Sequence, residues 1–145
     1  MSAPLYLYIM SYLLKADLQN SIEQTLLDAL DWSSDDSIIT TACSQAIGQL
    51  KAYTVDKYDI VTELAKTSVQ RDEMVLMIAK DLAIYHIWSY VDAASIPNTR
   101  RDRYKAAIDF LKDIQSGAVT MNLGDSVVAY IPIAGGSNDK RVSHY

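Results

Sequence analysis

The spacing of apolar and polar residues along the chain predicts three long helices. In the segment 36–53, apolar residues recur every three or four positions, the period of one helix face. A second helix begins at Arg71 and reads RDEMVLMIAKDLAIYHIWSYVDAA; because it is apolar around most of its circumference, we expect it at the centre of the fold. The third follows the break at Pro97 and runs to about Ser116, where Gly117 is suited to end it.

Shorter helices are predicted on the N-terminal side of these three. Helical spacing in the segment 15–30 is interrupted at Asn20 and Ser21, which indicates two short helices. The polar stretch DWSSDDS then reads as a loop that leads into the first long helix, with Ser34 or Asp35 as its N-cap.

The remaining connections are less regular. Segment 53–70 is predicted to be a loop with a short helical turn at Thr62–Ala65, and Asn98 or Thr99 is expected to cap the last long helix. Residues 4–10 alternate loosely and are predicted to be extended. The fold class is therefore all-α: a small bundle of four to five helices with an extended N-terminal segment and a long C-terminal arm.

The arm is the part of the chain that a helical bundle does not account for. Beyond Gly117 the helical period stops, and one strand is predicted at Val127–Ile131, followed by a proline and the Gly135–Gly136 hinge. A lone strand is not stable by itself, so it must pair with the N-terminal segment, a neighbouring subunit or another protein. We therefore divide the chain into a helical connector domain, 1–124, and an extended C-terminal assembly arm, 125–145.

Composition limits the kinds of partner. The chain has 145 residues, a formal net charge of −5 and a sequence pI of about 4.8, which disfavours tight binding to nucleic-acid phosphates. Ten tyrosines stand against one phenylalanine, a ratio that suits surfaces buried on association. The apolar N-terminus is interrupted at Lys15 and Asp17, too early to cross a bilayer, so no membrane is expected and the chain is interpreted as cytosolic.

Candidate catalytic and metal-binding residues are few. Cys43 and His86 could form a nucleophile and base, but Cys43 lies on an apolar helix face and His86 in a buried helix, where both are more often core residues. Asp31, Asp35 and Asp36 lack the spacing of a calcium loop and are better explained as helix-capping residues. We expect no enzyme, with no catalytic residue, no cofactor and no metal.

Two charged clusters are candidate partner-binding sites. The arginines at the start of the last helix stand where cations are unfavourable for the helix dipole. They are either a solvated face balanced by Asp92 and Asp102 or a contact with an acidic patch on another subunit. The proposed assembly residues from this cluster and from the arm are Arg100, Arg101, Arg103, Val127, Val128, Tyr130, Ile131, Lys140, Arg141, His144 and Tyr145.

The stretch MIAKDLAIYHIWSYVDAASIPNTRRDRYKAAIDFLKDIQSGAVTMNLG is similar to the central and C-terminal part of phage head–tail connector (adaptor) proteins of the Mu-like type, as found in Bacteroidetes phages and prophages. The most distinctive part is RYKAAIDFLKDIQSG, and the terminal GGSNDKRVSHY is similar to tails in several Bacteroidetes members. The segment after Tyr58 is longer than in compact members, and NTRRDR is unusually basic.

The resemblance implies a structural virion protein. Such proteins form a homo-oligomeric ring below the portal in the neck of the particle, extend the DNA channel and dock the tail. The implied partners are other copies of the chain, the portal protein and tail or neck proteins. DNA would pass through the channel without sequence-specific binding, and the protein would be made in the bacterial host cytoplasm.

Two other functions remain open from the residues. The chain could be a non-enzymatic helical protein–protein adaptor or regulatory module of a host or prophage, binding one protein through its tyrosine-rich surface. It could also be a small hydrolase that uses Cys43 or His86.

Overall fold

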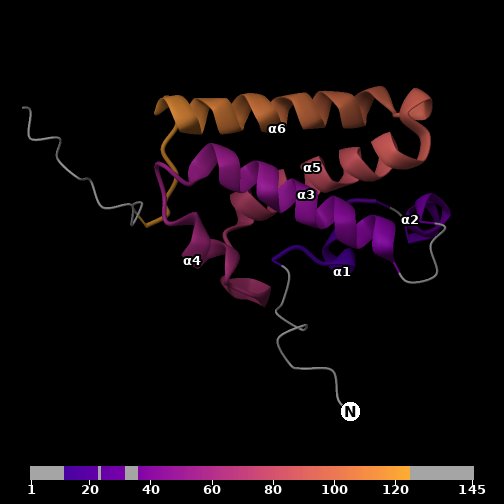
Figure 1. Ribbon diagram of the computed structural model, residues 1–145, viewed down its shortest axis with the longest axis horizontal. Coiled ribbons are helices and arrows are strands. Elements are labelled where there is room, and N and C mark those ends of the chain that lie inside the picture. Colours follow the sequence, from indigo (N-terminus) through magenta and orange to yellow (C-terminus); the bar gives the residue numbers. More distant parts are fainter. Residues whose placement is uncertain (1–11, 23, 32–35, 125–145) are drawn as a thin grey trace, which may run out of the picture.

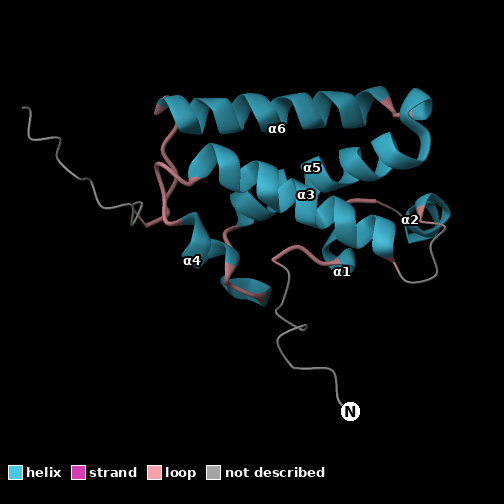
Figure 2. Cartoon of the chain, in the orientation of Figure 1, coloured by secondary structure: helices cyan, strands magenta, loops and turns pink. Residues whose placement is uncertain are grey.

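The computed structural model describes residues 12–22, 24–31 and 36–124, and these ranges contain helices joined by loops, with no strand (Figures 1 and 2). The predicted all-α class is confirmed. The turn predicted near Thr62 is a helix of its own, so the described residues form more helices than the four to five expected. The elements are α1 (Lys15–Leu18), α2 (Gln24–Leu30), α3 (Ser37–Thr54), α4 (Ile60–Leu64), α5 (Glu73–Asp92) and α6 (Asn98–Ser116), with 3-10 turns at Ser68–Gln70 and Ala93–Ser95.

Helix α5 is the centre of the fold, as its sequence predicts. It packs against both α3 and α6, which also contact each other (Figure 1). Leu82, Ile84 and Ile87 are fully buried on different sides of the helix, so nearly its whole circumference is covered. By length and composition Glu73–Ser95 could also cross a membrane, but half of that stretch is buried in the bundle, which accounts for its apolar character. Met77, an apolar residue of this helix, is nevertheless 43% exposed.

Two helices begin at residues that the sequence pattern did not indicate. Helix α5 starts at Glu73 rather than Arg71, because the Asp72 carboxylate accepts hydrogen bonds from the backbone N–H groups of the first turn, at 3.0 Å. Helix α6 is preceded by Pro97, whose carbonyl accepts the N–H groups of Arg100 and Arg101, so the expected caps Asn98 and Thr99 are already helical.

The start of α3 is also capped differently. The expected caps Ser34 and Asp35 lie outside the described residues. Asp36 occupies the N-cap position without capping the helix, since its carboxylate binds Lys15 Nζ at 2.8 Å. A long-range residue takes the capping role: the buried Asp31 carboxylate accepts the N–H of Ile39 at 3.4 Å. The interpretation of Asp31 as a helix-capping residue is thereby confirmed, whereas Asp36 does not cap the helix.

The end of α6 follows the sequence prediction. Gly117 has φ 84°, and its N–H donates to the carbonyls of Asp113 and Ile114. A positive φ is unfavourable for residues with a Cβ. We therefore expect Gly117→Ala to lower the free energy of unfolding by about 1 kcal/mol. Urea unfolding of Gly117→Asn is the matched control, since asparagine tolerates this conformation better; an equal loss in both variants would argue against the φ explanation.

The chain after α6 is hydrogen-bonded to the connection between α3 and α4. The N–H of Met121 donates to the Tyr58 hydroxyl at 2.8 Å, and the N–H of Asp59 donates to the Gly124 carbonyl at 2.7 Å. In Figure 1 this segment passes the end of α3 and reaches α4. The described residues thus end beside α4, and the division between domain 1–124 and arm 125–145 stays a prediction.

Candidate functional site

The arginine cluster at the start of α6 makes contacts within the chain. Arg103 Nε lies 2.7 Å from the buried Asp81 carboxylate of α5, which raises the pKa of the arginine. The solvated-face interpretation named Asp92 and Asp102 as balancing charges, but Asp81 is the residue paired with Arg103. The two helices are brought together by packing that the local sequence does not encode, so this pair could not be read from spacing alone.

The other two arginines contact backbone carbonyls. Arg100 Nη2 donates to the Ser21 carbonyl between α1 and α2, and burial followed by the nearby charge of Arg103 lowers the pKa of Arg100. Arg101 Nη2 lies 3.4 Å from the Ala93 carbonyl. The cluster therefore holds the start of α6 against its neighbours, while Arg101 and Arg103 remain exposed enough to meet a partner as well.

The other predicted assembly residues, Val127, Val128, Tyr130, Ile131, Lys140, Arg141, His144 and Tyr145, lie outside the described residues. Their role in partner binding stays a prediction.

Cys43 and His86 do not form a nucleophile–base pair in this fold. Cys43 is buried in α3, and burial, with a smaller effect of Asp17, raises the pKa of the thiol to about 12. The His86 imidazole instead makes a 2.9 Å hydrogen bond with Gln49, and its ring lies edge-on to Tyr104. Burial lowers the pKa of His86, which favours a neutral ring. The two residues serve helix packing here, as their positions in the sequence suggested.

Burial of Cys43 has a direct chemical consequence. A maleimide reagent is expected to leave the folded chain almost unmodified at neutral pH, because the thiol is 3% exposed and little of it is thiolate. Modification should become complete in denaturant. An Ala106→Cys variant, with an exposed thiol on α6, is the control for reagent activity. Rapid modification of Cys43 in the folded chain would contradict the burial seen here.

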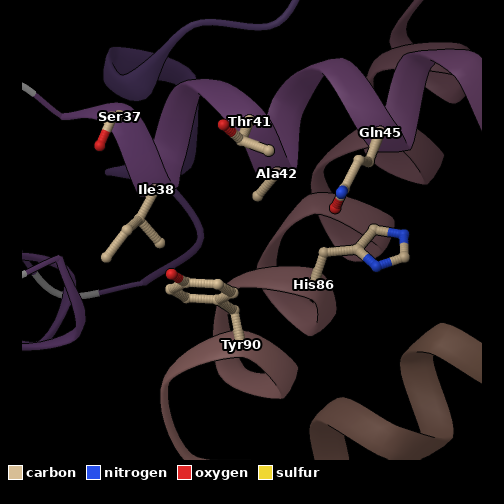
Figure 3. A pocket seen from close by; sticks show the side chains of 7 residues that line it. All are labelled: Ser37, Ile38, Thr41, Ala42, Gln45, His86 and Tyr90. Atoms are coloured by element: carbon tan, nitrogen blue, oxygen red, sulfur yellow. The ribbon is translucent and has the colours of Figure 1, made fainter.

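A shallow pocket of about 250 Å³ opens between α3 and α5 (Figure 3). Its lining is uncharged and combines hydroxyl, amide and imidazole groups with the apolar side chains of Ile38 and Ala42. Tyr90, which also lines it, is 70% exposed. The sequence pattern did not indicate it. The lining residues are Ser37, Ile38, Thr41, Ala42, Gln45, His86 and Tyr90.

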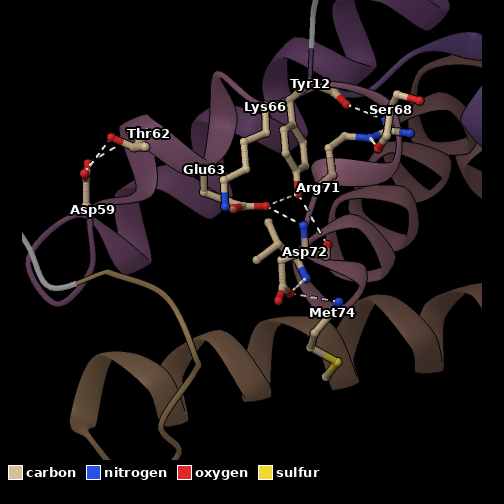
Figure 4. A network of polar contacts seen from close by, with 10 residues as sticks. Tyr12, Asp59, Thr62, Glu63, Lys66, Ser68, Arg71, Asp72 and Met74 are labelled. Carbon is tan, nitrogen blue, oxygen red and sulfur yellow. Dashed lines mark hydrogen bonds and ion pairs between the residues drawn. The ribbon is translucent and has the colours of Figure 1, made fainter.

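A buried carboxylate organises the junction of α4 and α5 (Figure 4). Glu63 is 2% exposed; its Oε1 accepts the Tyr12 hydroxyl at 2.9 Å and the Asp72 N–H, and Lys66 Nζ lies 2.7 Å from its Oε2. Burial alone would raise the pKa of Glu63, but the bonds from Lys66, the Asp72 N–H and Tyr12 outweigh it and hold that pKa below its ordinary value.

A second ion pair joins the same junction to the N-terminal part of the described chain. Both guanidinium Nη atoms of Arg71 bind the Asp17 carboxylate, at 2.7 and 2.8 Å, and Nη1 also donates to the Tyr12 carbonyl. Burial would raise the pKa of Asp17, but the bonds from Arg71 and from the Leu14 N–H lower it overall. Together with Glu63, this pair fixes the position of Tyr12, where the described chain begins.

An apolar groove, here named the α5–α6 groove, runs between α5 and α6. Its volume is about 320 Å³, and the Asp81–Arg103 ion pair is part of its wall. The exposed Met77 belongs to this surface, which explains why a residue on an apolar stripe of α5 is not in the core. The groove is lined by Met74, Met77, Ile78, Asp81, Arg103, Ala106, Ala107 and Phe110.

Comparison with known proteins identifies a phage family. A family model described as "Bacteriophage Mu, Gp36" matches residues 12–130, which include the whole described bundle. No curated protein and no solved structure matches the chain. The match confirms the resemblance to a Mu-like phage family, whereas the connector role and the Bacteroidetes source stay predictions. Because the match covers most of the sequence, this chain belongs to the bacteriophage Mu Gp36 family.

Proposed function

We propose that this protein is a structural component of the phage virion, a head–tail connector or adaptor that forms a ring below the portal, extends the DNA channel and docks the tail. The observation that carries the proposal is the family match over residues 12–130. In this role the protein is made in the cytoplasm of the bacterial host and resides in the neck of the particle. Its partners are further copies of itself, the portal protein and a tail or neck protein.

Charge and chemistry are consistent with this proposal. The formal net charge of −5 gives an acidic surface, which repels DNA phosphates and would let packaged DNA pass without adhering. The buried, protonated thiol of Cys43 and the Gln49-bound ring of His86 have structural roles. We therefore propose a non-enzymatic protein that acts through its surfaces and needs no cofactor.

The mass of the protein with and without portal protein tests the proposal. Native mass spectrometry or light scattering is expected to show a complex that contains many copies of this chain on one portal ring. A monomer or dimer that does not bind the portal protein would contradict the proposed ring. That result would favour the alternative function, a helical protein–protein adaptor or regulatory module of a host or prophage.

A further inference from the structure

We propose that a shallow pocket between α5, α6 and the connection from α1 to α2 binds an acidic side chain of another protein in the assembled particle. This site, here named the cationic pocket, has a volume of about 470 Å³. It is lined by Ser21, Glu73, Met74, Met77, Lys80 and Arg103. The inference rests on the proposed function, because the assembly supplies the partner, and it names the partner's chemistry: an aspartate or glutamate next to an apolar residue.

Two cations at this pocket share one carboxylate. Arg103 lines the pocket, and its Nε lies 2.7 Å from the Asp81 carboxylate. Arg100 reaches the same place by donating to the Ser21 carbonyl, and it forms no ion pair with a described residue. Burial and then the charge of Arg103 lower the pKa of Arg100, and Asp81 offsets this only in part. A further negative charge here would therefore be favourable.

Lys80 is the third cation, and it too has no ion pair with the described residues. Asp17, whose charge interacts with Lys80, is already bound by both Nη atoms of Arg71. Glu73 lines the same pocket but is exposed, where water screens its charge. The Lys80 ammonium stands on a flexible stem, so it can move to meet an incoming carboxylate. The pocket is thus a positively charged site on a chain whose formal net charge is −5.

The apolar part of the lining favours a protein segment over a nucleic-acid phosphate. Met74 and Met77 line both the cationic pocket and the α5–α6 groove, so the two surfaces are continuous. Methionine side chains adapt their shape to a partner, and burying them against another apolar surface is favourable. A carboxylate with an apolar neighbour would use both surfaces, whereas a phosphate would use the cations alone. The net charge of the chain also repels nucleic acid.

Carbodiimide coupling in assembled particles tests the inference with the full-length chain. The reagent joins a lysine amine to a carboxylate only where the two groups are in contact, and mass spectrometry of the digested product identifies both residues. We expect Lys80 to be coupled to an aspartate or glutamate of another protein chain, in a band heavier than the monomer on a denaturing gel. Lys105 lies 3.0 Å from Asp109 on its own helix, so this pair is the internal control for the reagent.

Charge reversal gives a second measurement. Lys80→Glu is expected to reduce the number of copies per particle by about tenfold, because it places like charges together in the contact. Lys112→Glu makes the same change at an exposed position of α6 outside the pocket lining, and it should leave incorporation unchanged. Circular dichroism checks that both variants fold. Lys80→Gln removes the charge without reversing it, so it should show a smaller loss and replaces Lys80→Glu if reversal disturbs the fold.

Three outcomes overturn the inference. Coupling of Lys80 only to a carboxylate of its own copy would mean that the chain itself balances the charge of the pocket. If Lys105 is coupled and Lys80 is not, no carboxylate enters the pocket. If Lys80 becomes reactive toward acetylation only after nuclease digestion of opened particles, its occupant is nucleic acid. Particles that contain the chain as a ring without the Lys80 coupling remove only this inference, whereas absence of the chain from particles removes the proposed function as well.

Discussion

Replacement of Glu63 by alanine is expected to lower the free energy of unfolding by about 3 kcal/mol. The carboxylate lies in the interior and accepts bonds from the Tyr12 hydroxyl and the Asp72 N–H; without it the N–H would lose its acceptor and the hydroxyl would keep only the Asp72 carbonyl, at 3.4 Å. A buried donor left without an acceptor costs about 1–3 kcal/mol. Urea unfolding followed by circular dichroism measures the change.

Two milder variants separate the parts of this loss. Tyr12→Phe removes one donor and leaves the carboxylate with its other bonds, so we expect a loss of about 1 kcal/mol. Lys66→Ala removes only the ion-pair partner, whose side chain is partly exposed, so we expect a smaller loss than for Glu63→Ala. If Glu63→Ala were no more destabilising than Lys66→Ala, the buried hydrogen bonds would not be the important contribution.

The same carboxylate predicts the direction of the pH dependence. The pKa of Glu63 in the folded chain lies below its ordinary value of 4.5, so the unfolded chain binds the proton more readily. The stabilisation is therefore present above pH 4.5 and is lost as the pH falls through the folded pKa. Glu63→Gln should be less stable at neutral pH and should lose less of its remaining stability in acid. If the free energy of unfolding decreased equally steeply below pH 4.5 in the unmodified chain and in Glu63→Gln, this assignment would be wrong.

Removal of residues 125–145 is expected to leave the helical bundle folded but to abolish incorporation of the protein into particles. The described residues provide the core, with Leu82, Leu111 and Ile114 fully buried among other described side chains. The deleted arm carries the apolar segment Val127–Ile131, which is predicted to require a partner. Circular dichroism tests the fold, and an immunoblot of purified particles tests incorporation.

A shorter deletion separates the apolar segment from the polar tail. A chain that ends at Gly136 keeps Val127–Ile131 and loses the cationic residues from Lys140 onward. If the apolar segment is the main contact, this chain should still enter particles. Normal incorporation of the chain that ends at Gly124 would exclude the arm as an assembly element.

Local patterns predicted the helices well because a helix face repeats over many residues. The 3.6-residue period of α3 predicted one buried face, and the apolar circumference of α5 predicted burial on several sides. The structure shows both. The end of α6 could also be predicted from the sequence, because glycine accommodates the positive φ that Gly117 adopts there. These features depend on residues close together in the sequence.

The polar contacts could not be predicted in the same way, because they join residues far apart in the chain. Glu63 lay in a segment with no clear period, and only the fold brings Tyr12 and Asp72 to its carboxylate. Arg71 looked like the first residue of a helix, whereas its guanidinium binds Asp17. The α5–α6 groove likewise depends on how two helices pack together. The sequence does not show that Met77 lies on its surface, because the exposure of Met77 follows from that packing.

The position of the protein in the particle tests the connector proposal most directly. Particles carrying a gold-labelled copy of the chain can be imaged by negative-stain electron microscopy, and the protein can be recovered from the same particles for imaging alone. We expect label at the head–tail junction and, in the recovered sample, rings with a central channel. Label elsewhere on the particle, or recovered protein that is monomeric in the presence of portal protein, would contradict it.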